Sequence, residues 1–477
     1  MKKSALIFLS GVIVAAGAGG AWWWQQAGHA QALTATSLPA PPDVPAAPAI
    51  LRDQLAAAEA QARGRLGARS GTAKLSRIYH ANGFLAEATR CYSVLEIIEP
   101  TEPRWLHLHA TIIAGYGDFE PATTLWRRVV ALAPEYLPAQ LRLGDCLLKS
   151  NHPDEAAASY AAVLQRDPTN SYAVLGLARL DYEAARWEKA QERLETVVRQ
   201  TDYALGYDLI VTLYERTGQP DKARAIRASH KASGAFRDPP DPWLDDLIDV
   251  CFDPYRLALT AGFIARNGDP AKAVKLLERA IELAPDDVSS RFQLGTLSVA
   301  QGNLSVAREQ LERCTRLAPD FADGWAQLSA LETQLGETSA AARTLASGLA
   351  KCPQSPGLHL MRARALQKIG ANSEAIAEFR ESIRLRPNEA DAYIELANFL
   401  INLGSIDDAV RLLQQSLDAE PGNPTALATL TFHAISTGNE STALRWFSKV
   451  RNQPRTPAEQ VEKLRAAYQE QFGRPLR

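Results

Sequence analysis

The sequence predicts an all-α solenoid built from helix–turn–helix units, and three observations support this fold class. Prolines stand at 285, 319, 353, 387 and 421, each 34 residues after the one before. Alanines keep the same interval at 273, 307, 341, 375, 409 and 443. Turn signals such as Gly302-Asn303 and Gly404-Ser405 fall between one of these prolines and the next of these alanines. A fixed period of this length is typical of stacked helical pairs.

The same period continues toward the N-terminus, with prolines at 100, 134 and 168 and alanines at 88, 122, 156 and 190. The interval breaks between Ala190 and Ala273, which separates a first array over residues 69–234 from a second array over 254–457. Eleven units are expected: 69–102, 103–136, 137–170, 171–204, a short 205–234, 254–287, 288–321, 322–355, 356–389, 390–423 and 424–457. The fifth lacks a closing proline. The ninth has Arg362 near the expected leucine, so its first helix is expected to be shifted by one residue.

Composition places the chain among ordinary folded proteins. Of its 477 residues, 46% are hydrophobic and 22% are charged, close to globular averages. Lys and Arg number 52 against 54 Asp and Glu, a formal net charge of −2. A nucleic-acid-binding domain is expected to be strongly basic, so no nucleic-acid partner is expected. Five cysteines scattered singly at 91, 146, 251, 314 and 352 fit small buried residues better than disulfides or a zinc site.

Residues 1–24 have the features of a signal-anchor or a signal peptide. Two lysines at positions 2 and 3 precede an uncharged run over residues 4–24, and about 20 apolar residues suffice to span a bilayer as a helix. The lysines favour a cytoplasmic N-terminus with the remainder exported, and the tryptophans at 22–24 suit the far interface. Small-residue sites at 16–18 and 30–32 leave a cleaved signal peptide open as the alternative.

The segments that flank the arrays are expected to be a tether and two caps. Residues 25–49 are rich in Ala and Pro and predict a semi-extended linker stiffened by proline. Residues 50–68 predict an N-terminal capping helix, with Leu51, Leu55, Ala58 and Ala62 at helical spacing. Residues 458–477 predict a C-terminal capping helix and tail. Terminal units of a solenoid need such covers for their apolar faces.

The units resemble the tetratricopeptide repeat, whose pattern places Trp or Leu, Gly and Tyr on the first helix, Ala, Phe and Ala on the second, and Pro after it. The matching residues are Leu143, Gly144, Ala156, Tyr160 and Pro168 in one unit, Trp325, Leu328, Ala341 and Pro353 in another, and Tyr393, Leu396, Ala409 and Pro421 in a third. The resemblance implies a right-handed superhelical solenoid of a membrane-anchored or exported multi-repeat protein. It also implies a concave face, lined by the first helices, that takes peptides or partner segments.

The most individual stretch is the acidic insertion at residues 235–253, which holds six aspartates and the run Pro239-Pro240-Asp241-Pro242-Trp243. It predicts a loop that leads into a short amphipathic helix. One interpretation is a spacer that packs Trp243 over the seam between the arrays. The other is a docking element with an acidic rim around an aromatic anchor. A further hypothesis is that the acidic segment folds over a basic groove and competes with ligand.

The sequence contains no recognisable enzyme signature: HExxH, Walker and GxSxG motifs are all missing. His107 and His109 are two residues apart and do not face each other on a helix, which argues against a metal pair. A non-enzymatic protein without cofactor or metal is therefore expected.

Partner-binding residues are expected on the first helices and in the insertion. In the first array the candidates are basic, which favours an acidic peptide or an anionic polymer, whereas the second array is more neutral. The candidates are Lys74, Arg77, Arg104, His107, Arg142, Arg179, Arg216, Trp243, Asp245, Asp246, Arg364 and Asn398.

Taken together, these features predict a scaffold or adaptor that presents a concave helical groove to a protein or peptide partner in the cell envelope. Its array would lie in the periplasm and residues 4–24 would anchor it in the inner membrane. The first alternative is a periplasmic or secreted binding protein for an anionic polymer or peptide. The remaining alternative is an enzyme with unrecognised site residues.

Overall fold

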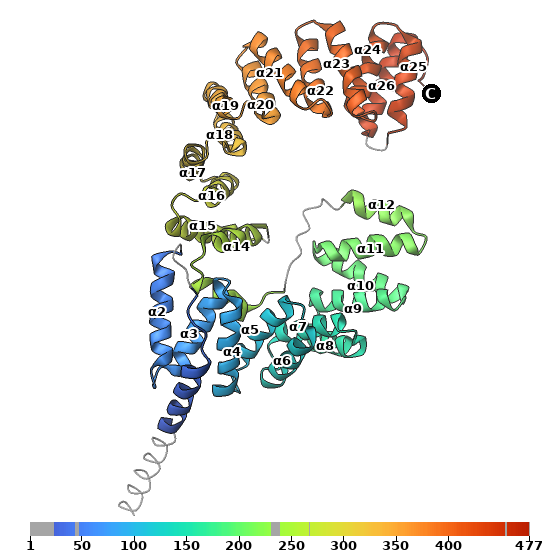
Figure 1. Ribbon diagram of the computed structural model, residues 1–477. Coiled ribbons are helices and arrows are strands. Elements are labelled where there is room, and N and C mark those ends of the chain that lie inside the picture. Colours follow the sequence, from blue (N-terminus) through green and yellow to red (C-terminus); the bar gives the residue numbers. More distant parts are fainter. Residues whose placement is uncertain (1–22, 43–46, 230–238, 267, 454–455, 477) are drawn as a thin grey trace, which may run out of the picture. The chain divides into compact units, whose positions relative to one another are not determined.

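The computed structural model describes residues 23–42, 47–229, 239–266, 268–453 and 456–476 (Figure 1). Over these ranges the chain is helical, without strands, and eleven successive helix pairs coincide with the eleven expected units. The all-α repeat solenoid is therefore confirmed. The chain forms two compact units, residues 1–285 and residues 286–477.

The first compact unit contains α2 (Ala49–Arg63) followed by six of the helix pairs. These pairs are α3 (Ala68–Ala81) with α4 (Leu85–Ile98), α5 (Pro103–Gly115) with α6 (Phe119–Leu132), α7 (Leu137–Lys149) with α8 (Pro153–Arg166), α9 (Ser171–Glu183) with α10 (Trp187–Gln200), α11 (Ala204–Arg216) with α12 (Pro220–Ser229), and α14 (Pro254–Arg266) with α15 (Pro270–Leu283).

The second compact unit contains five helix pairs and a final helix, α26 (Ala458–Phe472). The pairs are α16 (Val288–Ala300) with α17 (Leu304–Leu317), α18 (Ala322–Gln334) with α19 (Thr338–Lys351), α20 (Pro356–Lys368) with α21 (Asn372–Leu385), α22 (Ala390–Asn402) with α23 (Ile406–Ala419), and α24 (Pro424–Ser436) with α25 (Glu440–Arg451).

Two small-residue positions in each repeat explain its geometry. The periodic alanines lie where the two helices of a pair cross, and their exposed fraction is 0–1% from Ala88 to Ala443, because only a methyl group lets the backbones approach. Between the helices, one residue per turn takes a positive φ, and this residue is usually glycine, as in Gly302 at +78°. Asn151 and Ala185 hold this position at φ +61° and +56°.

The N-terminal region differs from the expected tether. Residues 23–37 are helical, and the hydroxyl of Thr34 donates to the Ala62 carbonyl of α2 at 3.1 Å. Ala, Gln and Leu, all good helix formers, precede the first proline at 39, so the helix extends through this stretch. Leu51, Leu55, Ala58 and Ala62 of α2 are buried, as expected for a capping helix.

Most of the predicted signal-anchor over residues 4–24 lies outside the described residues, which include only its last two positions, Trp23 and Trp24. Within the described ranges, no helix has both the length and the apolar character needed to cross a membrane.

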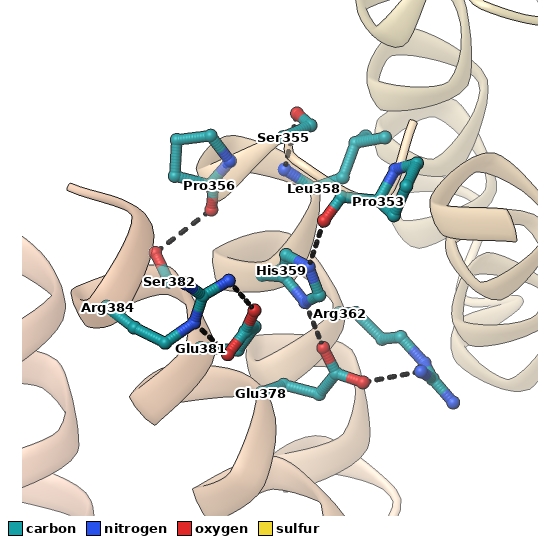
Figure 2. A network of polar contacts seen from close by, with 10 residues as sticks. All are labelled: Pro353, Ser355, Pro356, Leu358, His359, Arg362, Glu378, Glu381, Ser382 and Arg384. Atoms are coloured by element: carbon teal, nitrogen blue, oxygen red, sulfur yellow. Dashed lines mark hydrogen bonds and ion pairs between the residues drawn. The ribbon is translucent and has the colours of Figure 1, made fainter. Parts of the chain in front are cut away.

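The ninth repeat corrects one expectation. Its first helix, α20, begins at Pro356, which is 34 residues after the start of α18 at Ala322, so the helix is not shifted. Arg362 simply takes the place of a leucine, and its guanidinium reaches the Glu378 carboxylate on α21 at 2.5 Å (Figure 2). The imidazole Nδ1 of His359 lies 2.5 Å from the other oxygen of Glu378. This carboxylate allows a cation to occupy an otherwise apolar repeat position.

The insertion forms two short helical turns, α13 (Pro242–Asp245) and the 3₁₀ helix η1 (Asp246–Val250). Leu247 and Phe252 are buried in the same core as α3 and α4, and Leu283 of α15 packs against that core. The Arg279 guanidinium of α15 donates to the carbonyls of Ile248 and Asp249 at 2.9 and 3.0 Å. The first compact unit consequently extends to Pro285, whereas the period break had suggested a division within the insertion.

Candidate partner-binding face

The first helices of the repeats in residues 1–285 line one face of that compact unit. α9 contacts both α7 and α11, and the insertion contacts α3 through η1 and α5 through α13. We call the side formed by α3, α5, α7, α9 and α11 the inner face, and residues 239–253 the docked segment. The docked segment therefore lies along the α3–α5–α7 part of the inner face.

Asp241 is the most deeply held polar residue of the docked segment, with an exposed fraction of 2%. The hydroxyl of Tyr136 donates to its Oδ1 at 2.6 Å, and His107 Nε2 lies 2.9 Å from its Oδ2. Arg142 Nε is 3.5 Å from the same Oδ2. Burial alone would raise the pKa of Asp241, but the hydrogen bonds from His107 and Tyr136 and the charge of Arg142 hold this pKa below its usual value.

The hydrogen bonds of His107 define its tautomer. The indole N–H of Trp126 donates to His107 Nδ1 at 3.1 Å, and an indole nitrogen can only donate. The lone pair therefore resides on Nδ1, and the ring proton resides on Nε2, where it is donated to Asp241. A fully buried neutral imidazole, 0% exposed, thus connects the carboxylate to the core of α5 and α6.

Trp243 provides the aromatic contact of the docked segment. Its ring stacks on Tyr136 with centroids 3.6 Å apart and planes 10° apart, and its backbone N–H donates to the Tyr136 hydroxyl at 3.0 Å. The His107 and Trp243 rings meet edge to face, with their centroids 5.5 Å apart. Aromatic pairs of this kind contribute about 0.5–1.5 kcal/mol beyond their buried area.

Arg77 of α3, Arg104 of α5 and Asn82, which directly follows α3, hold the remainder of the docked segment. Arg104 donates to the Asp246 carboxylate at 2.8 Å, and Arg77 donates to the Asp246 carbonyl at 3.1 Å. The Asn82 amide donates to the Val250 carbonyl and accepts from the Phe252 N–H. The acidic segment does fold over basic residues of the inner face, as hypothesised. Whether it competes with a ligand stays a prediction.

The structure separates the other predicted residues of the first array from this contact. Lys74 is exposed, and so is Asp245, which belongs to the docked segment itself. Arg216 lies over the Tyr182 ring, with its guanidinium carbon 5.4 Å from the centroid. Arg179 lines a cavity farther along the inner face.

The second compact unit contains two of the predicted site residues, Arg364 and Asn398. The Arg364 guanidinium is engaged by the Glu395 carboxylate of the following repeat, with Nε 2.7 Å from Oε2. This ion pair offsets the charge that Arg364 was expected to offer a ligand. Asn398 is exposed on α22.

Tyr136, Trp126, Asn82 and Asp241 contribute to the site but were not singled out from the sequence. Tyr136 and Trp126 look like ordinary packing residues, and their partners are more than 100 positions or one helix away. Asp241, between two prolines and before Trp243, carried the only local signal.

A cavity of about 70 Å³ continues the inner face beyond the docked segment. It lies between the first helices α7, α9 and α11, with Tyr160 of α8 behind them. Its lining residues are Leu141, Asp145, Tyr160, Tyr172, Leu175, Gly176, Arg179, Tyr203, Ala204, Leu205 and Pro239. Among the described residues, no cluster of three His, Cys, Asp or Glu side chains could hold a metal ion.

Sequence models of the tetratricopeptide repeat match residues 148–209, 265–335 and 403–468, residues 116–171 and 360–424, and residues 322–365. These matches together cover well over half of the chain. The chain belongs to the tetratricopeptide repeat family.

Three similar proteins illustrate the range of this family. DnaJ homolog subfamily C member 3 of Mus musculus is 24% identical over 48% of this chain and 40% of its own length. Cellulose synthase 1 operon protein C of Komagataeibacter xylinus is 26% identical over 41% of this chain and 15% of its own length. The chain thus spans less than half the length of these curated relatives. The crystal structure of yeast Tom70 covers 86% of this chain and 97% of its own, with 13% identity and a TM-score of 0.37.

Proposed function

We propose that this protein is a non-catalytic scaffold whose inner face, in residues 1–285, binds an acidic segment of a partner protein. One observation carries the proposal: the same face holds an acidic segment of its own chain. The docked segment supports the chemistry proposed for the partner, a carboxylate at His107 and Tyr136 and an indole ring on Tyr136.

The surroundings of Asp241 support recognition of a carboxylate at this place. The two hydrogen-bond donors come from the same repeat, His107 on α5 and Tyr136 at the last position of the repeat, directly before α7. Arg142 adds positive charge beside Asp241, and Arg104 pairs with Asp246 farther along the docked segment. Charge-assisted hydrogen bonds from several donors are stronger than neutral ones and favour an anionic group over its amide analogue.

The proposal can be tested with a peptide that copies residues 239–246. A chain with Asp241→Ala and Trp243→Ala loses the two side chains that fill the site, while Leu247 and Phe252 remain in the core. The labelled peptide is expected to bind this variant with a dissociation constant on the order of 100 μM or better, measured by fluorescence anisotropy. Wild-type chain is expected to bind it more weakly at this site, because its own segment competes.

Two matched peptides provide the controls. Replacing the aspartate that corresponds to Asp241 by asparagine, or the tryptophan that corresponds to Trp243 by alanine, is expected to weaken binding at least tenfold. Equal binding of all three peptides would show that the face does not recognise this chemistry, and the proposal would then be wrong.

We further propose that the repeats act in the cell envelope and that residues 4–24 attach the protein to the inner membrane. The two lysines before an uncharged run of this length support the proposal. Carbonate extraction of membranes tests it: a full-length product that resists extraction is expected. A shortened product in the soluble fraction would indicate cleavage and would overturn the anchor.

A further inference from the structure

The cavity between α7, α9 and α11 is continuous with the path of the docked segment. Pro239, the first described residue of that segment, forms part of the cavity wall. From there the docked segment runs over α7, α5 and α3, whereas the cavity extends in the opposite direction over α9 and α11. A chain that follows the inner face in that direction would pass directly over the cavity.

The cavity has its shape because residue 176 is glycine and because aromatic rings form its walls. A Cβ atom at position 176 would lie 2.5 Å from the Tyr160 ring, so glycine is the residue that lets this ring form the floor. The rings of Tyr172 and Tyr203 lie 4.8 Å apart at an angle of 31° and form one side. Tyr203 directly precedes α11, as Tyr136 directly precedes α7. Such walls suit a flat aromatic side chain.

The charges at the cavity favour an anionic group beside that ring. Arg179 is half-buried and makes no ion pair within the described part of the chain. Asp145 faces the same space, but its Oδ1 accepts the Tyr160 hydroxyl at 2.6 Å. Burial raises the pKa of Asp145 despite that hydrogen bond and the charges of Arg179 and Arg142. One oxygen of this carboxylate is thus already engaged by Tyr160, and Arg179 is the cation that lines the cavity.

We infer that this cavity is a second subsite of the inner face, which takes an aromatic side chain of a partner segment and places a neighbouring carboxylate at Arg179. This inference rests on the proposed function, because it assigns the same acidic and aromatic chemistry to a second place on one face. The docked segment presents that pair at the first subsite, with Asp241 near Arg142 and Trp243 on Tyr136.

The wild-type chain provides a direct test, because its own segment fills the first subsite. The labelled peptide that copies residues 239–246 is titrated into the wild-type protein and into Arg179→Gln and Tyr203→Ala. Both substitutions are expected to weaken the residual binding at least fivefold. Arg166→Gln, exposed on α8 and outside the cavity lining, removes the same charge and is expected to leave the binding unchanged. Circular dichroism of each variant checks its folding.

The outcomes separate this inference from the proposed function. If the peptide binds the Asp241→Ala, Trp243→Ala chain but binds the wild-type chain with no dependence on Arg179 or Tyr203, the subsite is wrong and the proposed function stands. If Arg166→Gln weakens binding as much as Arg179→Gln, only general electrostatic attraction is present and the subsite is again wrong. If the peptide binds none of these proteins, both proposals fail.

Discussion

At the scale of single residues, Asp241 and His107 determine how the docked segment is held. Both are almost fully buried, and each is hydrogen-bonded on more than one side. Removing one partner from such a pair leaves the other with unsatisfied polar atoms, which costs more than the hydrogen bond itself contributed.

Asp241→Ala is therefore expected to loosen the docked segment by about 3 kcal/mol. Hydrogen exchange of the η1 amides should accelerate by about 100-fold, the equivalent of that energy. Asp249→Ala is the matched control, because this aspartate is in the same segment but exposed. Equal acceleration in both variants would mean that the His107 contact is not what holds the segment.

The lowered pKa of Asp241 gives the contact a defined pH dependence. A carboxyl group with a depressed pKa in the folded state stabilises that state fully above its ordinary value of 3.8, and the contribution is lost as the pH falls through the lower folded value. With 5-fluorotryptophan labelling, the ¹⁹F resonance assigned to Trp243 by Trp243→Phe should stay constant from pH 7 to about pH 4 and change only below it. A transition near pH 6 would contradict this and would point to a histidine.

The sequence predicted which side chains share one face and suggested that the acidic segment covers it, but it did not predict the individual pairs. The helical spacing placed Arg77, Arg104, His107 and Arg142 on one face, and the structure brings all four to the docked segment. Their partners could not be identified, because Asp241 and Asp246 are 134 to 169 positions away from the side chains His107, Arg104 and Arg77. No local pattern encodes such a contact.

At the scale of the element, the turns between paired helices show how each repeat tolerates substitution. The turn residue with positive φ is glycine in most repeats, because an L side chain is strained there. The period places Ala185 at the same position in the fourth repeat, with φ +56°. The repeat retains its geometry despite this residue, since the two helices it joins are packed against their neighbours.

Ala185→Gly is accordingly expected to stabilise the α9–α10 pair by about 0.5–1 kcal/mol, the strain relieved less the extra backbone entropy of glycine. Gly336→Ala, the opposite change at φ +80°, is expected to cost about 1 kcal/mol. Thermal unfolding followed by circular dichroism measures both. A loss of stability in Ala185→Gly would show that the backbone at this turn is not strained.

Two predictions about elements were wrong, those for the first helix of the ninth repeat and for the tether over 25–49. The expected shift of the ninth repeat assumed that a leucine position must be apolar, but Glu378 accommodates Arg362 there. The tether expected over 25–49 gave too much weight to prolines that begin only at 39 and too little to the helix formers before them.

At the scale of the whole molecule, the insertion belongs to the core of the first compact unit. Leu247 and Phe252 complete the apolar cluster of α3 and α4, and α15 contributes Leu283 and Arg279 to the same region. The repeat period revealed the number of repeats but not this division, because a break in the period does not indicate to which side the extra residues pack.

A fragment of residues 1–285 is expected to melt roughly 10 °C above a fragment of residues 1–229, since the shorter one exposes the core that Leu247 and Phe252 cover. The shorter fragment should also bind a hydrophobic dye. At the other boundary, the matched comparison is between the melting temperatures of fragments 254–477 and 286–477. Equal melting temperatures of the two N-terminal fragments would contradict the assignment of the insertion to their core.

The contact between His107 and Asp241 has a consequence for synthesis of the chain. The two residues are 134 positions apart, and the Asn82 contacts with Val250 and Phe252 span 168 and 170 positions. At roughly 5–20 residues per second, the ribosome adds the second partner on the order of 10–30 s after the first. Throughout that interval His107 and Asn82 have only their nearby partners, Trp126 and the Ile78 carbonyl. The contacts that hold the docked segment on these repeats are thus completed only once residues 241–252 have been synthesised.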